Sequence, residues 1–226
     1  GDDVAGLMIT NPNTLGLYET AMPELSRLVH ERGGLVYGDG ANLNAVLGRA
    51  RPGDAGVDVM QFNLHKTFTT PHGGGGPGSG PVAFRSILEP YQPIPVVRRD
   101  GERCIVDEAR AQSVGRVRSF FGNFGMMVRA YTYIRELGPE GLAAVSDLAV
   151  LNANYLAARI SELFPLGFTT PALHEAVFTD RELEQTTGVK TLDVAKRLID
   201  YGFHPPTVYF PLVVRGALMV EPTETE

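Results

Sequence analysis

Short apolar runs alternate with amphipathic segments along the first third of the chain. Three of these runs have the length and composition of β-strands, at residues 5–10, 35–37 and 57–62. Between the first two, a helical pattern begins at Pro23 and ends at Gly33-Gly34. Strand, helix and strand at this spacing favour an α/β fold with a mainly parallel sheet and crossover helices.

The rest of the chain is dominated by a long helical pattern. It runs from Asn123 to Gly138, and a second helical segment follows from Pro139 to Phe164. Beyond it we expect a strand at 174–179, an amphipathic helix at 192–201 and broken strand material at 208–220. The sequence therefore predicts three units, at residues 1–122, 123–164 and 165–226, of which the last is a small α/β lobe.

Composition places the chain among ordinary folded proteins and excludes some functions. It has 226 residues, 43% of them hydrophobic, and a formal net charge of -6, which argues against a nucleic-acid surface. We find no apolar stretch long enough to cross a membrane and no signal peptide. A single cysteine, Cys104, favours a reducing compartment, so we expect a cytoplasmic protein, or one of the mitochondrial matrix if eukaryotic. Both ends lack a tail or cap, which predicts a longer parent chain.

Basic residues are concentrated in one segment, where acidic residues interleave with them. The basic side chains are Arg98, Arg99, Arg103, Arg110, Arg116 and Arg118, and the acidic ones are Asp100, Glu102, Asp107 and Glu108. We expect a solvated loop here, and the alternative is a docking surface for an acidic partner.

The segment from Tyr37 to Gly80 holds the most informative side chains. Asp39 ends one predicted strand and Lys66 follows the next, so both can face the crevice at the carboxyl edge of a parallel sheet. An acid and a lysine together suit pyridoxal 5'-phosphate (PLP), because the amine holds the aldehyde while the carboxylate keeps the pyridine nitrogen protonated.

Neighbouring residues fit the same hypothesis. Ala41 is small enough for a flat ring to lie close to the backbone, and His65 or Thr67 has a group that can hydrogen-bond the phosphate or the imine. Spacing alone leaves a plainer interpretation open, in which Lys66 is a solvated surface residue and Asp39 is a turn or cap.

Further candidates surround this segment or lie far from it. The glycines of residues 73–80 suggest backbone amides that cradle an anion or approach a substrate closely, although the motif is not a P-loop. His72 is a proton-transfer candidate or a structural histidine. His174-Glu175 opens a predicted strand and either contacts the site or is structural. Cys104 has no base nearby in sequence, and no spacing is typical of zinc.

Several motifs, in order and over nearly the whole chain, resemble one family. They are residues 37–44 (YGDGANLN), 51–54 (RPGD), 63–68 (NLHKTF), 71–81 (PHGGGGPGSGP), 151–155 (LNANY), 193–197 (DVAKR), 200–204 (DYGFH) and 218–224 (LMVEPTE). This pattern resembles the P-protein of the glycine cleavage system, glycine dehydrogenase (decarboxylating). The tract 209–214 (YFPLVV) is most similar to the second subunit of two-subunit bacterial forms.

The resemblance implies a fold-type I PLP-dependent transferase, similar to aspartate aminotransferase. Residues 1–122 would be the second half of the PLP-binding large domain, followed by connecting helices and a truncated small domain. Lys66 would hold PLP as a Schiff base, Asp39 would pair with the pyridine nitrogen, and Ala41 would pack against the ring. A segment before Gly1 would supply a ring-stacking residue and much of the phosphate site.

The same resemblance implies an activity and partners. The family decarboxylates glycine and passes the aminomethyl group to the lipoyl arm of the H-protein, and either a first P-protein subunit or a second copy would complete an oligomer. An arginine would bind the glycine carboxylate, with Arg98, Arg99, Arg116 and Arg118 as candidates.

Two other functions stay open from the sequence. One is a different fold-type I enzyme, such as a cysteine desulfurase, an aminotransferase or a glutamate decarboxylase, which shares the acid-then-lysine order. The other is a non-catalytic scaffold that keeps the fold and serves only in assembly.

Overall fold

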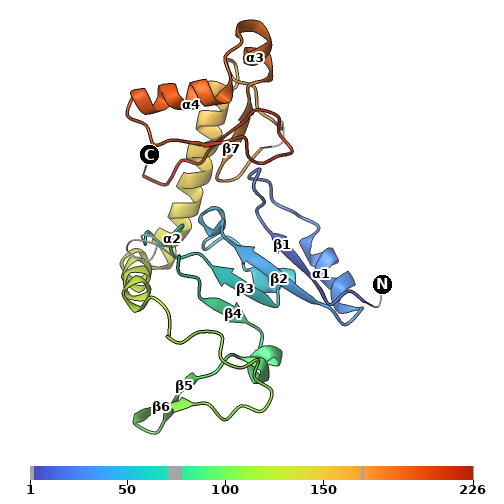
Figure 1. Cartoon of the computed structure of the whole chain (residues 1–226), viewed down its shortest axis with the longest axis vertical. Helices are drawn as coiled ribbons and strands as arrows, with labels where there is room; N and C mark the ends of the chain where they lie inside the picture. The colour runs from blue at the N-terminus through green and yellow to red at the C-terminus, as the bar shows by residue number, and fades with distance from the viewer. Residues whose placement is uncertain (1–2, 71–77, 169–170, 226) are drawn as a thin grey trace.

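The described chain contains three sheets, and a long broken helix joins the four-stranded sheet to the three-stranded one (Figure 1). A computed structural model describes residues 3–70, 78–168 and 171–225. The first lobe contains a four-stranded sheet of order β1-β2-β3-β4, and the second contains a three-stranded sheet of order β7-β9-β8.

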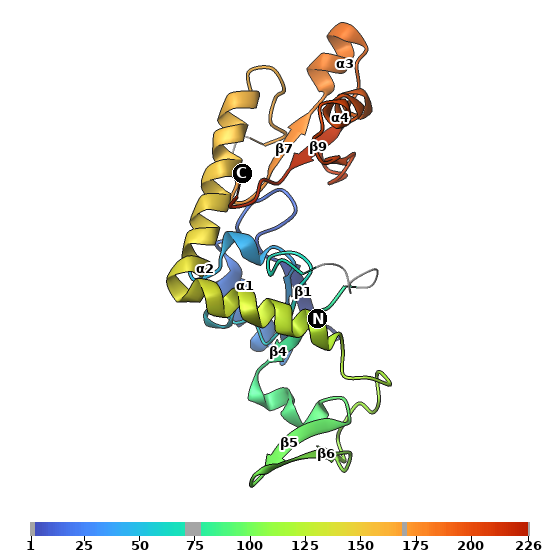
Figure 2. The same cartoon turned by 90° about the vertical axis from the view of Figure 1, so that its left-hand side faces the viewer.

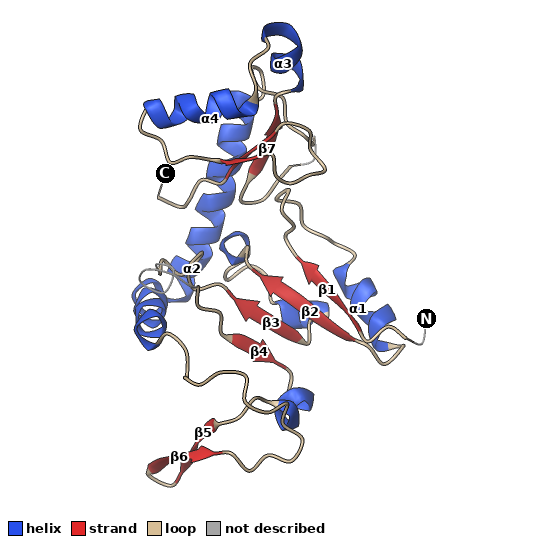
Figure 3. Ribbon diagram, viewed as in Figure 1, coloured by secondary structure: helices blue, strands red, loops and turns tan. Residues whose placement is uncertain are grey.

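The sheet of the first lobe is parallel except at one edge. β1 (Gly6–Thr10), β2 (Leu35–Gly40) and β3 (Val59–Phe62) run parallel, and β4 (Val82–Phe84) is antiparallel to β3. Helix α1 (Met22–His30) connects β1 to β2, as the pattern between Pro23 and Gly33 predicts. The carboxyl ends of β1, β2 and β3 therefore meet at one edge, which faces the second lobe (Figure 3).

Short 3-10 helices follow the strands of this sheet. They are η1 (Leu43–Ala45), η2 (Pro52–Ala55) and η3 (Ser86–Tyr91). η1 belongs to the main apolar core together with the loop that follows β3 and with the first half of the long helix. The buried members of this core are Leu43, Ala45, Val46, Met60, Leu64, Phe68 and Ala130.

A buried carboxylate ties three elements of the first lobe together. Asp58, whose side chain is 0% exposed, accepts hydrogen bonds from the backbone N–H of Val36 at 2.8 Å and from Arg85 Nη1 at 2.8 Å. Its Oδ2 also lies 2.7 Å from His30 Nε2 at the end of α1. Burial alone would raise the pKa of Asp58, but these donors lower it below its ordinary value.

Helix α2 (Phe124–Ile160) is two helices joined at a break. Gly138 has φ 63° and ψ -175°, and Pro139 follows, so the break lies where the sequence predicts one helix to end and another to begin. Figure 2 shows the two halves at an angle to each other, the first beside the sheet and the second leading to the second lobe.

The second lobe is built on an antiparallel sheet. β7 (Ala176–Thr179), β8 (Thr207–Val208) and β9 (Ala217–Val220) form it, and α3 (Arg181–Thr187) and α4 (Thr191–Asp200) connect β7 to β8. β7 begins two residues later than the pattern predicts, and α3 is an element that the pattern misses. Phe164 and Phe178 pack edge to face in its core, with ring centroids 6.1 Å apart.

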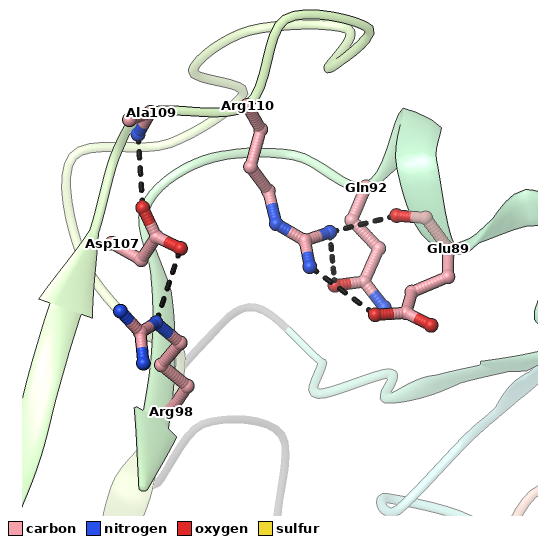
Figure 4. A network of polar contacts seen from close by, with 6 residues as sticks. All are labelled: Glu89, Gln92, Arg98, Asp107, Ala109 and Arg110. Carbon is pink, nitrogen blue, oxygen red and sulfur yellow. Dashed lines mark hydrogen bonds and ion pairs between the residues drawn. The ribbon is translucent and has the colours of Figure 1, made fainter. Parts of the chain in front are cut away.

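The charged segment near residue 100 is not a loop. It forms a hairpin of β5 (Val96–Asp100) and β6 (Arg103–Asp107), with Gly101 at φ 59° in the turn. Figure 4 shows its ties: Arg98 Nε donates to Asp107 Oδ2 at 3.3 Å, and Arg110 donates to the Glu89 carbonyl at 2.7 Å. The expectation of a loop was wrong because three consecutive charged residues, Arg98, Arg99 and Asp100, interrupt the apolar pattern of β5.

Within the residues that the structure describes, no helix is both long and apolar enough to span a membrane.

Candidate functional site

Asp39 lies in a row of polar side chains across the sheet of the first lobe. Thr10, Asp39 and Gln61 are direct neighbours on β1, β2 and β3, so their side chains share one face. Thr10 Oγ1 donates to Asp39 Oδ2 at 3.4 Å, and Gln61 Nε2 donates to Asp39 Oδ1. The carboxylate is thus held between a hydroxyl and an amide at the carboxyl edge of the sheet.

Ala41 follows Asp39 in the turn after β2. Its backbone N–H donates to Asp39 Oδ1 at 2.9 Å, which fixes the carboxylate against the turn. Asn42 continues this turn and donates from Nδ2 to the carbonyl of Pro12 at 3.2 Å, so the segments that follow β1 and β2 are joined. The small side chain of Ala41 is half-buried beside them.

Lys66 is exposed on a loop that is anchored on both sides. Leu64 donates its N–H to the Ser79 carbonyl at 3.0 Å, and Arg129 Nε donates to the Thr69 carbonyl at 2.8 Å. Leu64 and Phe68 are buried in the main core, and Phe68 packs edge to face on Tyr133 with centroids 6.5 Å apart. Apolar residues on either side therefore turn inward and leave Lys66 facing outward.

His65 and Thr67 flank the lysine in this loop. His65 Nδ1 accepts the N–H of Ser79 at 3.3 Å, and its ring packs so closely on Gly78 that a Cβ there would come within 2.4 Å. Thr67 is half-buried. His72 and the glycines of residues 73–76 lie outside the described residues, so their predicted roles stay predictions.

The second lobe reaches the same edge through two segments. Leu173 donates its N–H to the Gly16 carbonyl at 2.7 Å, and Asn44 Nδ2 donates to Glu221 Oε1 at 3.2 Å. Tyr133 Oη donates to Glu224 Oε1 at 3.3 Å, and burial followed by the charge of Glu224 raises the pKa of this phenol to about 12. These bonds bring His174, Glu175 and Glu221 within the electrostatic range of Lys66.

Sequence reasoning named His174 and Glu175 as candidates and missed Glu221. The signal for Glu221 is the pairing of Ala176 with Val220, which places residues 175 and 221 at the same end of two neighbouring strands. Such a pairing is visible in the fold and not in local sequence.

The arginine candidates lie on the hairpin arm and its continuation. Arg98 pairs with Asp107 at 3.3 Å, and Arg116 pairs with Glu108. Cys104, which is exposed, lies on β6 of the same arm, beyond the β4 edge of the sheet (Figure 1).

Comparisons with known proteins show which sequences and folds this chain resembles. The sequence model of the glycine dehydrogenase C-terminal domain matches residues 145–226. The chain is 58% identical over 226 residues to "Probable glycine dehydrogenase (decarboxylating) subunit 2" of Halalkalibacterium halodurans. This match covers 100% of the chain and 46% of that protein. The protein of the same name from Fervidobacterium nodosum is 56% identical over 225 residues, and the match covers 100% of this chain and 47% of that protein.

Solved structures share the fold. A crystal structure of glycine decarboxylase (P-protein) of the glycine cleavage system, in an inhibitor-bound form, matches with a TM-score of 0.79 and 24% identity. The match covers 100% of this chain and 52% of that one. The apo cysteine desulfurase of Thermococcus onnurineus NA1 matches with a TM-score of 0.70 and 16% identity, over 97% and 55% of the two chains.

The fold is therefore the fold-type I architecture, α/β with a mainly parallel sheet in the first lobe. The chain spans about half the length of the curated relatives that it matches. More than half of all positions along the chain are identical to those of proteins named as glycine dehydrogenase (decarboxylating) subunit 2, so the chain is similar to this family over its entire length.

Proposed function

We propose that the protein to which this chain belongs decarboxylates glycine with PLP and transfers the remaining aminomethyl group to the lipoyl arm of an H-protein. The observation that carries this proposal is the placement of Lys66. It stands exposed on an anchored loop after β3, at the sheet edge where Asp39 ends β2. The likeness to glycine dehydrogenase subunit 2 supports glycine as the substrate.

The residues present fit PLP. A carboxylate and a primary amine at one sheet edge are the two groups that the pyridine nitrogen and the aldehyde require. Beside Asp39, the buried Gln61 Oε1 makes no hydrogen bond to any described residue. It is therefore a free acceptor for a bound group. Lys66 would hold the aldehyde carbon, Asp39 the pyridine nitrogen, and Ala41 would lie against the ring.

PLP supplies one capacity when it is bound: its protonated ring delocalises the electron pair that carbon dioxide leaves behind. The chain itself supplies position and charge. Asp39, fixed by Ala41 N–H, Thr10 and Gln61, holds a negative charge where the ring nitrogen needs it. The anchored loop keeps the backbone of Lys66 at the same edge, which reduces the entropy lost on reaction.

The names of the similar proteins also support a proposal about the partners of this protein. The relatives are named as a second subunit, which supports a first P-protein subunit as the partner of this protein, with a second copy of the chain as the alternative. The lipoylated H-protein would deliver the acceptor arm to the edge at Lys66.

Cysteine desulfurase is a second candidate, because a member of that class shares the fold. A desulfurase needs a cysteine nucleophile near the substrate. The sequence contains one cysteine, Cys104, and it lies on the hairpin arm and not at the edge that carries Lys66. The likeness in sequence to glycine dehydrogenase subunit 2 makes the glycine reaction the better supported of the two.

The test uses the intact protein with its partner subunit. PLP is added, the protein is reduced with borohydride, and the labelled peptide is mapped. We expect the label on Lys66 and its loss in K66A, while K196A in the same chain remains labelled at Lys66. A label elsewhere, or none, would contradict the assignment of Lys66.

A second measurement tests the substrate. Glycine-dependent exchange of carbon dioxide, with lipoylated H-protein present, should require Lys66. Labelling of Lys66 without any exchange, together with sulfur release from cysteine, would favour the desulfurase. Labelling without either activity would favour the scaffold.

A further inference from the structure

A cluster of three ionisable side chains joins the second lobe to the edge at Lys66. His174 and Glu175 precede β7, and Glu221 follows β9. Because Ala176 pairs with Val220 in the antiparallel ladder, the two glutamates extend from the same end of neighbouring strands. The sheet of the second lobe therefore sets these groups beside each other.

One imidazole nitrogen lies between the two carboxyl groups. His174 Nε2 is 3.5 Å from Glu175 Oε1 and 3.9 Å from Glu221 Oε1. The side chains of His174 and Glu175 are 0% and 3% exposed, while that of Glu221 is 46% exposed. The cluster is thus closed on the protein side and open to solvent at Glu221.

Three buried polar atoms of this cluster have no hydrogen-bond partner in the described part of the chain. Neither ring nitrogen of His174, nor Glu175 Oε1, has a hydrogen-bond partner among the residues that the structure describes. Native proteins rarely leave such groups buried without a partner, so their presence calls for a functional explanation. A metal site does not explain it, because no described group of three or more His, Cys, Asp or Glu is arranged to hold an ion.

The charge of Lys66 acts on all three groups. Burial chiefly, and Lys66 in addition, lowers the pKa of His174 to about 4, so the imidazole is neutral near pH 7. Burial, and next the charge of Glu221, raises the pKa of Glu175 to about 8, which the N–H of Gly16 and Lys66 partly oppose. Burial also raises the pKa of Glu221, against Asn44 and Lys66. Glu175 therefore holds its proton up to a higher pH than an ordinary glutamate does.

We propose that Glu175, together with His174 and Glu221, takes the proton from the Lys66 ammonium and so makes this amine reactive toward an aldehyde. The step is a balanced proton transfer: Nζ loses a proton and keeps its electron pair, and a carboxylate oxygen gains that proton. The neutral imidazole of His174 lies beside both carboxyls, with Nε2 within 4 Å of an oxygen of each.

Two features of the chain suit this role. Lys66 makes no ion pair in the described part of the chain, and its four-carbon stem lets Nζ move between the sheet edge and the cluster. A base works best when its pKa lies near the working pH, and that of Glu175 lies there because of burial. This inference rests on the proposed function of Lys66 as the residue that holds the cofactor aldehyde.

The experiment measures how fast Lys66 reacts, without using glycine. The intact protein is mixed with PLP for short times from pH 6 to pH 9, reduced with borohydride, and the Lys66 peptide is quantified by mass spectrometry. Lys190 and Lys196 serve as internal references. In the wild type we expect the rate at Lys66 to rise through an inflection near pH 8, above the trend of the two reference lysines.

Variants then identify the base. E175Q should slow labelling of Lys66 at pH 8 by roughly tenfold or more and should remove the inflection. E182Q, on the exposed helix α3 of the same lobe, should leave the rate of labelling at pH 8 and the inflection unchanged. E221Q should move the inflection to lower pH, because the charge of Glu221 raises the pKa of Glu175.

The outcomes separate this inference from the proposed function. A wild-type profile in E175Q, or an unmoved inflection in E221Q, would overturn the role of Glu175. If E175Q does not fold, as judged by circular dichroism, the pH profile of E221Q still tests the role of Glu175. The side chain of Glu221 is half-exposed, so we expect E221Q to fold. Absence of label on Lys66 in the wild type, with Lys190 labelled, would instead overturn the proposed function.

Discussion

Gly16 lies against Glu175 so closely that a Cβ atom on Gly16 would come within 2.6 Å of the Glu175 carbonyl oxygen. The same Cβ would lie 3.2 Å from Glu175 Cγ. Gly16 belongs to the turn after β1, and Glu175 to the segment before β7, so this contact joins the two lobes next to the acidic cluster. The φ of 73° at Gly16 also lies in the left-handed region, which favours glycine.

Replacing Gly16 with alanine should therefore separate the two segments. We expect G16A to lower the free energy of unfolding by about 1–3 kcal/mol, from backbone strain and from the close contact. Urea denaturation followed by circular dichroism measures the change. G53A is the matched control, because nothing lies within 4 Å of a Cβ at that position and its φ is not in the left-handed range. Equal stability of G16A and G53A would contradict the close approach.

Replacing the buried carboxylate of Asp58 should destabilise the first lobe. D58N leaves the N–H of Val36 and the guanidinium of Arg85 without a charged acceptor, so we expect a loss of about 2–4 kcal/mol at pH 7. D54N removes only an exposed ion pair with Arg51 and should cost less than about 1 kcal/mol.

The effect of Asp58 should depend on pH in a defined direction. Because its pKa is lowered in the folded protein, its stabilisation is present above the unfolded value of 3.8 and is lost as pH falls through the folded pKa. The difference in unfolding free energy between wild type and D58N should therefore shrink in acid. A difference that grows below pH 4 would contradict this assignment.

Glu175 should give the opposite pH dependence. Its pKa is raised from 4.5 to about 8, so the folded state holds a proton that the unfolded state has released, and stability falls as pH rises through that window. His174, with a pKa lowered from 6.5 to about 4, adds stability as pH rises from 4 to 6.5. Between pH 6.5 and 8 only the Glu175 effect operates within this pair.

Thermal unfolding between pH 6.5 and 8 isolates that effect. The wild type should lose up to roughly 1.4 kcal/mol of unfolding free energy per pH unit from Glu175, and E175Q should lack this slope. E182Q is the control and should follow the wild type. A slope that persists in E175Q would show that another group is responsible.

Arg129 should hold the loop of residues 64–70 through the carbonyl of Thr69. R129A removes the 2.8 Å hydrogen bond to the Thr69 carbonyl, so we expect faster amide hydrogen exchange in residues 64–70 by about fivefold, equivalent to about 1 kcal/mol. R135A, exposed on the same helix, should leave the exchange of this loop unchanged. Unchanged exchange in R129A would show that the core residues alone fix the loop.

Local sequence was sufficient for the elements that repeat a simple pattern. The strands that end at Thr10 and Gly40, and the helix break at Gly138, follow from apolar runs and from glycine and proline. The roles of Asp39, Ala41, His65, Lys66 and Thr67, and the three-unit division of the chain, stay predictions. The placement of Asp39 and Lys66 at one edge follows from the order of parallel strands, so it was predictable.

Other features depend on pairing between distant segments. The hairpin of β5 and β6 escaped notice because Arg98, Arg99 and Asp100 interrupt its apolar positions. Glu221 joins Glu175 only through the ladder between β7 and β9, and the apolar sequence around either residue does not encode that register.

The two anchors of the Lys66 loop have a consequence for biosynthesis. The hydrogen bond of Leu64 requires Ser79, which is synthesised later. The hydrogen bond to the Thr69 carbonyl requires Arg129, which the ribosome adds 60 residues after Thr69. Such long-range closures are slow compared with local helix formation. The loop that carries Lys66 is therefore anchored at both ends only after translation has passed Arg129 in the first half of α2.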